Sequence, residues 1–320
     1  MANLKLIKSK IISYKKTGTV THAMEAVSAV KMRKAQERAL SGRSYAAAAL
    51  TILERVSGTA DMSRHPLMDN SIQGLPLEKK DIVSPSGGKK VAFIVVTSDK
   101  GLAGSVNSAV IRKVENEIVA RGLSKDDVVM ACIGRRGGDY FYNRGYDVRI
   151  RQLNRSDDVT ETEMREVTDQ VLAWHESGEI GTAVIAYQNF LSTFEQQPSV
   201  RQIIPITTEG MRETVAGIRP ARGKYAPSGE PSLAPASYTI EPDADSVLSV
   251  LLPKLLNIAV YHGLLESKAS EHSARMVAMK SATDKAKDMA HSLTRTFNKV
   301  RQAAITREVS EITSGMEAMR

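Results

Sequence analysis

Several residue types are scarce in this chain, and each scarcity excludes a class of protein. A single cysteine, Cys132, among 320 residues excludes an intrachain disulfide and fits a reducing compartment. No run of about 18 apolar residues occurs, so we expect no membrane-spanning segment. The first residues, MANLKLIKSKI, lack the apolar core and the cleavage site of a signal peptide. Only 5% of residues are aromatic, whereas alanine is plentiful and 13 methionines are present, which favours helix over strand.

Proline is almost absent from both ends of the chain, which indicates two long helices. Residues 3–57 contain no proline and only two glycines, Gly18 and Gly42, although the poor helix formers at 17–20 could bend this helix. After Pro253, the last 67 residues contain no proline. Apolar or small residues recur there at alternating steps of four and three over about seven heptads, which predicts a coiled coil. The predicted seam consists of Ile258, His262, Leu265, Ala269, His272, Met276, Met279, Thr283, Ala286, Ala290, Leu293, Phe297, Val300 and Ala304.

The middle of the chain has a different period. Three apolar, β-branched runs at 90–98, 127–134 and 183–190 are typical of buried strands, and 200–206 is expected to add an edge strand that tolerates Pro205. Strands that alternate with helices predict a small, mainly parallel, Rossmann-like α/β domain. The helical patterns lie at 106–121, 138–144 and 160–177. Residues 58–90 and 217–237 are rich in proline and glycine, and we expect a loop and a surface insert there.

These patterns predict an α/β fold in which the N- and C-terminal helices form a long antiparallel two-helix coiled coil. Both helices leave the same domain, so they must run antiparallel when packed side by side. The predicted division of the chain is 1–57 for the N-terminal helix, 58–90 for the loop, 91–210 for the α/β domain, 211–243 for the insert and a foot contact, and 244–320 for the C-terminal helix.

The two predicted helices have unequal lengths, so the longer one should project alone. The N-terminal helix should end opposite roughly residue 300, which leaves about 20 residues of the C-terminal helix unpaired. This end carries an apolar stripe, and an isolated helix of that length is only marginally stable in water. We therefore expect another protein to surround it. The stripe consists of Ile305, Val309, Ile312 and Met316.

The positive charge of the chain is concentrated near its N-terminus. The net charge is +8, and residues 1–57 alone hold 11 basic and 3 acidic residues. Four basic residues cluster at 31–38. They lie at the end of a stretch, 23–32, in which seven of ten positions are apolar and are spread around the whole helix. Such a helix can meet nucleic acid, an anionic membrane or an acidic protein. The crowded basic residues are Lys31, Arg33, Lys34 and Arg38.

No motif in the sequence indicates a catalytic, cofactor-binding or metal site. SGGKK at 86–90 fails the phosphate-loop pattern, and GRRGGDYFYNRG at 134–145 fails the dinucleotide pattern. His262 and His272 fit no metal spacing and are interpreted as seam residues. The segment TSDKGLAGSVNSAV at 97–110 could bind an anion at a helix N-terminus, but a simple strand–turn–helix junction needs the same glycines and is favoured.

Four segments of this sequence resemble the gamma subunits of bacterial F-type ATP synthases. They are THAMEAVSAVKMRKAQ, TSDKGLAGSVNSAV, EHSARMVAMKSATDKA and NKVRQAAITREVSEITSGM. Ala103 and Ser105 depart from the family pattern, which usually has a cysteine and a second glycine in this junction. The resemblance implies a non-catalytic central rotor shaft. In this family the shaft couples proton-driven rotation of a membrane ring to conformational cycling of the beta catalytic sites, in ATP synthesis or, reversed, in hydrolysis.

The resemblance also implies partners, a location and individual contacts. The implied partners are the hexamer of alpha and beta subunits, the epsilon subunit, the membrane c-ring and a regulatory inhibitor protein, with no cofactor, nucleic acid or small-molecule substrate. The implied location is peripheral, on the cytoplasmic face of the bacterial inner membrane. Tyr238 and Glu241 resemble foot contacts with the ring. The residues implied to meet the beta subunit are Met24, Lys31, Arg33, Lys34, Arg38, Arg275, Gln302 and Thr306.

Two other classes of protein remain open from the residues alone. An α/β nucleotide-binding enzyme with helical arms would bind ATP or NAD in its middle domain. A basic coiled-coil tether or nucleic-acid binder would place the N-terminal helix on phosphates. That helix is apolar on the turns that would face the phosphates, and its basic residues are not interleaved with aromatic ones.

Overall fold

The computed structural model describes most of the chain. The described residues are 2–41, 43–57, 65–68, 89–154, 156–207, 209–210, 241 and 243–319. The expected surface insert at 217–237, most of the expected loop at 58–90, and Tyr238 lie outside them. The chain forms two compact units, one of residues 1–29 with 275–320 and the other of residues 30–274. Helices α1 (Ala2–Ser41) and α8 (Ala244–Glu317) contribute to both units.

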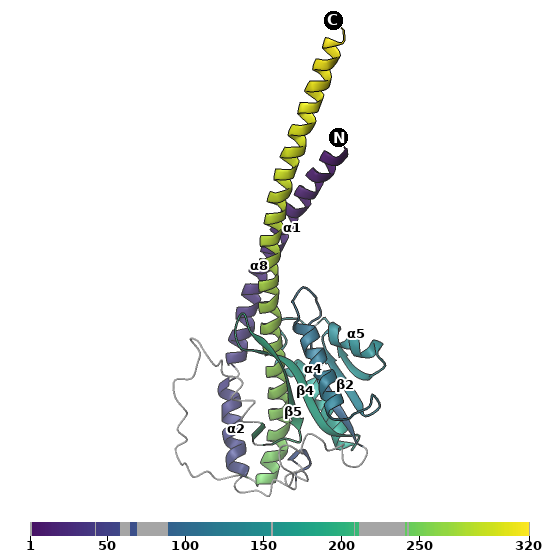
Figure 1. Cartoon of the computed structure of the whole chain (residues 1–320). Helices are drawn as coiled ribbons and strands as arrows, with labels where there is room; N and C mark the ends of the chain where they lie inside the picture. The colour runs from purple at the N-terminus through teal and green to yellow at the C-terminus, as the bar shows by residue number, and fades with distance from the viewer. Residues whose placement is uncertain are drawn as a thin grey trace. The chain divides into compact units, whose positions relative to one another are not determined.

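The larger unit is built on a five-stranded sheet with the strand order β3-β2-β1-β4-β5 (Figure 1). The pairs β1–β2, β1–β4 and β2–β3 are parallel, and β5 pairs antiparallel with β4. The predicted, mainly parallel sheet is confirmed. The expected edge strand ends just before Pro205. The strands are β1 (Lys90–Val96), β2 (Val128–Ile133), β3 (Asp147–Gln152), β4 (Ile180–Phe190) and β5 (Gln196–Ile204).

Helices cover both faces of this sheet. Side chains of α4 (Val106–Ala120) and α5 (Arg135–Asn143) form one core with β1, β2 and β4. Side chains of α2 (Arg43–Ser57), α6 (Glu161–Glu176) and α8 form a second core that involves all five strands. Each central strand contributes alternate residues to the two cores, which explains why β1 and β2 are continuously apolar. A short 3₁₀ helix, η2 (Pro66–Met68), adds Leu67 and Met68 to the second core.

The first part of α8 is more apolar than the sequence led us to expect. By length and composition alone, one 18-residue window of this helix could cross a membrane, and 56% of that window is buried inside the protein. Leu252, Leu256 and Val260 from this part are fully buried in the core with the sheet. A helix that packs along a sheet passes the same hydropathy test, so the window is accounted for by burial.

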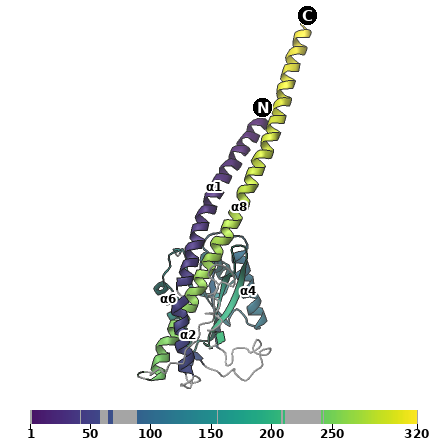
Figure 2. The ribbon, with the colours of Figure 1, turned by 90° about the vertical axis from the view of Figure 1, so that its left-hand side faces the viewer.

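The smaller unit is an antiparallel pair of helical segments, which Figure 2 shows side by side. The hydroxyls of Thr21 and Thr283 are 2.7 Å apart, and a Cβ added to Gly18 would lie 3.7 Å from that of Ala286. Because residue numbers rise along α1 while they fall along α8, the segments run antiparallel. α1 is continuous through residues 17–20. The predicted seam is confirmed from Met276 to Val300, where all its positions are buried or half-buried, whereas Ala304 is exposed.

Candidate functional site

The end of α8 offers a surface that no described part of the chain covers. Every residue from 301 to 319 is exposed, and the four apolar side chains of the predicted stripe are 53–60% exposed. Gln302 and Thr306 lie in the same stretch, where the Thr306 hydroxyl donates to the Gln302 carbonyl at 3.0 Å. Continuing the antiparallel register places Ala2 opposite Gln302. The exposed stretch therefore begins close to the predicted residue 300.

The apolar residues on the several faces of α1 at 20–32 are also only partly covered by the described part of the chain. Val20 and Val27 are more than half exposed, as is Val30 at the start of the larger unit. Met24 is half-buried, and its carbonyl accepts a hydrogen bond from the Ser28 hydroxyl at 2.7 Å. This helix therefore presents apolar side chains on faces that a surrounding protein could cover. Arg275, by contrast, is buried, with only 7% of its surface exposed.

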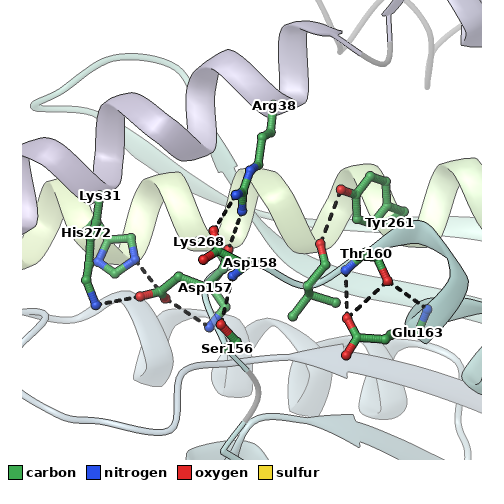
Figure 3. A network of polar contacts seen from close by, with 11 residues as sticks. Lys31, Arg38, Ser156, Asp157, Asp158, Thr160, Glu163, Tyr261, Lys268 and His272 are labelled. Atoms are coloured by element: carbon green, nitrogen blue, oxygen red, sulfur yellow. Dashed lines mark hydrogen bonds and ion pairs between the residues drawn. The ribbon is translucent and has the colours of Figure 1, made fainter.

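The four basic residues at 31–38 of α1 divide into two kinds. Arg33 and Lys34 are exposed. Lys31 donates from Nζ to Oδ2 of Asp157 at 2.6 Å (Figure 3). Arg38 donates from Nη1 to the backbone oxygen of Asp157 at 2.9 Å and forms an ion pair with Asp158. Two of the four therefore already have acidic partners inside the chain.

Asp157 is the centre of a cluster that the sequence did not predict. We define the Asp157 cluster as Asp157, Lys31, Lys268 and His272 (Figure 3). Oδ1 of Asp157 lies 3.1 Å from Nε2 of His272 and 3.5 Å from Nζ of Lys268. The hydrogen bonds from His272 and then Lys31 hold the pKa of Asp157 far below its ordinary value, although partial burial opposes this shift. The residue lies in the loop between β3 and α6.

The junction between β1 and α4 uses its polar groups internally. Thr97 Oγ1 accepts from the backbone N–H of Gly137, and Asp99 Oδ1 accepts from that of Arg135, both at 2.9 Å. Asn107 binds Ser98 through both its amide oxygen and its amide nitrogen. A cavity of about 10 Å³ beside the junction is large enough for one water molecule at most. These contacts support the structural interpretation of this motif over the anion site.

A larger groove lies between α2 and the start of α8. It has a volume of about 520 Å³. Glu241, one of the two predicted foot contacts, is exposed and lines it together with Lys254. Ile52 and Val250 in its lining are about half exposed. Among the described residues, no group of three or more histidine, cysteine or acidic side chains is placed to hold a metal ion.

Comparison of the chain with known proteins gives similarity along its full length. A family model described as ATP synthase matches residues 3–319. A protein named ATP synthase gamma chain from Heliobacterium modesticaldum is 36% identical over 320 residues, and one of the same name from Pelotomaculum thermopropionicum is 35% identical over 319 residues. Each alignment covers 100% of both proteins.

Two solved structures share the fold. A chain of the Euglena gracilis mitochondrial ATP synthase, described as OSCP/F1/c-ring, has a TM-score of 0.62 at 15% identity, with 99% of this chain and 95% of that one covered. A chain of the Tetrahymena thermophila mitochondrial ATP synthase, described as central stalk and c-ring, has a TM-score of 0.55 at 20% identity. That alignment covers 82% of this chain and 99% of the other.

Proposed function

The chain belongs to the gamma-chain family of ATP synthases, and from this premise we propose that it is the non-catalytic central rotor of an F-type ATP synthase. The observation that carries the proposal is the antiparallel helix pair whose longer member ends in 19 exposed residues with an apolar stripe, 301–319. Such an end is stable in water only when another protein encloses it. An asymmetric shaft that turns inside a ring of catalytic subunits would hold each site in a different conformation.

The proposed partners are those that surround a rotor of this kind. A hexamer of alpha and beta subunits encloses the exposed end of α8. The epsilon subunit and the membrane c-ring meet the foot, where Glu241 and Tyr238 are the proposed contacts. One solved structure of similar fold is described as containing F1 and a c-ring, and another as a central stalk and c-ring, which supports this arrangement. The proposed location is peripheral, on the cytoplasmic face of the bacterial inner membrane.

Individual contacts with the beta subunit remain proposals, and we divide them by whether each side chain is accessible or already engaged within the chain. Met24, Gln302 and Thr306 lie on α1 and the exposed end of α8, and Arg33 and Lys34 are exposed on α1. We propose these five as the direct contacts. Lys31, Arg38 and Arg275 are engaged or buried within the chain, so a contact with beta would require them to serve two partners.

Co-assembly tests this proposal directly. The full chain, produced together with alpha and beta subunits of a related bacterial enzyme, should co-purify with them as one complex that hydrolyses ATP. A bead attached to the chain should rotate when ATP is supplied. Micromolar binding of ATP or NAD by the isolated chain, without co-assembly, would instead favour the enzyme with helical arms. Steeply salt-dependent binding to duplex DNA would favour the basic tether.

A further inference from the structure

The two long helices are attached to the α/β domain of the larger unit in different ways. The core on their side of the sheet contains side chains of α2, α6 and α8 but none of the described side chains of α1. Of the residues 30–41 whose side chains are described, Ala35 is the one buried apolar residue. This part of α1 therefore gains little from apolar burial against the domain.

Helix α8 has an attachment of its own that does not involve Asp157. Its apolar residues lie in the core, and three serines bond to β4 and the hairpin that follows it. Ser267 Oγ accepts from the N–H of Gln188 at 3.0 Å, and Ser270 Oγ donates to the carbonyl of Gln188 at 3.2 Å. Ser273 Oγ donates to the carbonyl of Thr193 at 2.6 Å.

The polar contacts of α1 converge on one short loop (Figure 3). Lys31 binds the side chain of Asp157, and Arg38 binds its backbone oxygen and Asp158, so contacts nearly two helical turns apart meet the same two residues. The loop itself is held in place. Tyr261 of α8 donates to the carbonyl of Val159 at 3.3 Å, and Thr160 forms a capping box with Glu163 at the start of α6.

The carboxylate of Asp157 also joins α1 to α8. Lys31 binds one oxygen, while Lys268 and His272 of α8 bind the other. His272 is almost completely buried, and the side chain of Asp157 is one-third exposed. An exposed ion pair contributes little by itself, but a carboxylate shared by three partners in a partly buried network couples all of them.

We propose that Asp157 is a positioning residue, which holds α1 in register with α8 and with the α/β domain while the rotor turns. This inference rests on the proposed rotor function. Helix α8 can transmit torque to the α/β domain without the Asp157 cluster, because its apolar residues and its three serines already fix it to the sheet. Torque between α1 and the α/β domain is transmitted through the Asp157 cluster. Loss of the carboxylate charge should therefore loosen α1 and leave α8 in place.

The test compares Asp157→Asn with Asp158→Asn in the full chain, assembled with its partner subunits. Both changes remove one charge at nearly constant volume, but among the residues labelled in Figure 3 the carboxylate of Asp158 pairs with Arg38 alone, whereas that of Asp157 has three partners. Hydrogen exchange should become about tenfold faster in 30–41 of Asp157→Asn, while 252–264 of α8 stays as in the wild type. Proton pumping per ATP hydrolysed should fall in Asp157→Asn and fall less in Asp158→Asn, which removes the ion pair with Arg38 but keeps the bond from Arg38 to the backbone oxygen of Asp157. Unchanged exchange and pumping in Asp157→Asn would overturn the proposal.

A double-substitution cycle identifies the partner through which Lys31 acts. Lys31→Met, at a partly exposed position outside both cores, should reproduce the pumping loss of Asp157→Asn. The double variant should lose no more than Asp157→Asn alone, because both substitutions remove the same contact between Lys31 and Asp157. If the two losses multiply instead, Lys31 acts on another subunit and the proposal fails. Absence of rotation in the wild-type complex would contradict the rotor function itself, which this cycle does not address.

Discussion

At the scale of single residues, Cys132 is the chain's one thiol and should be unreactive in the folded protein. It is fully buried in β2, and burial raises its pKa to about 12 from an ordinary value of 9.0. A thiol reagent at pH 8 should modify the native chain very slowly and the urea-unfolded chain at once, because the thiolate is the reactive form. Labelling of the native protein at the rate of a free thiol would contradict this burial.

The same pKa shift predicts how Cys132 affects stability at alkaline pH. Since the folded-state pKa is raised, its stabilising contribution is complete below about pH 9 and is lost as the pH rises toward 12. Cys132→Ala should therefore flatten the fall in the free energy of unfolding over that window. Urea unfolding of both proteins at pH 7, 9 and 10.5 would measure this change in the free energy of unfolding. An identical pH slope in both proteins would be inconsistent with the shift.

Two glycines that look alike in the sequence should respond oppositely to alanine. Gly134 has φ of +99°, and a Cβ there would lie 2.0 Å from the carbonyl oxygen of Thr97, so Gly134→Ala should cost several kcal/mol, roughly 3 or more. Gly18 lies within α1, and its added Cβ would meet Ala286 at an ordinary 3.7 Å. Gly18→Ala should stabilise the helix pair by about 0.5–1 kcal/mol. Thermal unfolding of both variants checks the contrast, and a destabilised Gly18→Ala would contradict the described register.

At the scale of elements, the sequence predicted those helices and strands whose apolar residues follow a regular local spacing. The apolar runs identified β1, β2 and β4, and the four-three spacing identified the seam of α8, because side-chain burial there follows a fixed period. β3 was missed because Arg149 and Arg151 interrupt its apolar residues at an edge of the sheet. The predicted single helix over 1–57 is described as α1 and α2. The five-part division of the chain remains a prediction.

The Asp157 cluster could not be predicted, because its members are far apart in the sequence. Lys31 and His272 lie 126 and 115 residues from Asp157. Two consecutive aspartates in a loop are ordinary surface residues unless the fold brings basic helices over them. Sequence spacing grouped Lys31, Arg33, Lys34 and Arg38, but it could not separate the two side chains that bind the loop from the two that are exposed.

The cluster also predicts an acid-dependent loss of stability. The pKa of Asp157 is depressed in the folded chain, so its contribution is complete above the unfolded value near 4 and is lost as the pH falls below it. Because the carboxyl is partly exposed, we expect about 1 kcal/mol between wild type and Asp157→Asn at pH 7. That difference should narrow below pH 4 in urea titrations. A gap that widens on acidification would contradict the assignment of the shift.

At the scale of the whole molecule, the exposed end of α8 should matter for assembly and not for folding. Residues 301–319 contribute no side chain to either buried core. Deleting them should leave the thermal unfolding of the α/β domain unchanged. Burying four half-exposed apolar side chains in a partner would contribute about 1 kcal/mol each at most, so the deletion should weaken co-assembly with alpha and beta subunits substantially.

A helix-preserving control separates the apolar stripe from the length of the shaft. Replacing Ile305, Val309, Ile312 and Met316 with glutamine keeps residues of moderate to good helix propensity but removes the apolar surface. If the stripe is the contact, this variant should lose co-assembly to nearly the same extent as the deletion, and the isolated chain should self-associate less than the wild type in analytical ultracentrifugation. If only the deletion weakens assembly, then the length of α8, and not the burial of its apolar stripe, is what the alpha and beta subunits require. If the deletion unfolds the α/β domain, the end of α8 packs on its own chain, and the proposal that it projects into the partner subunits is wrong.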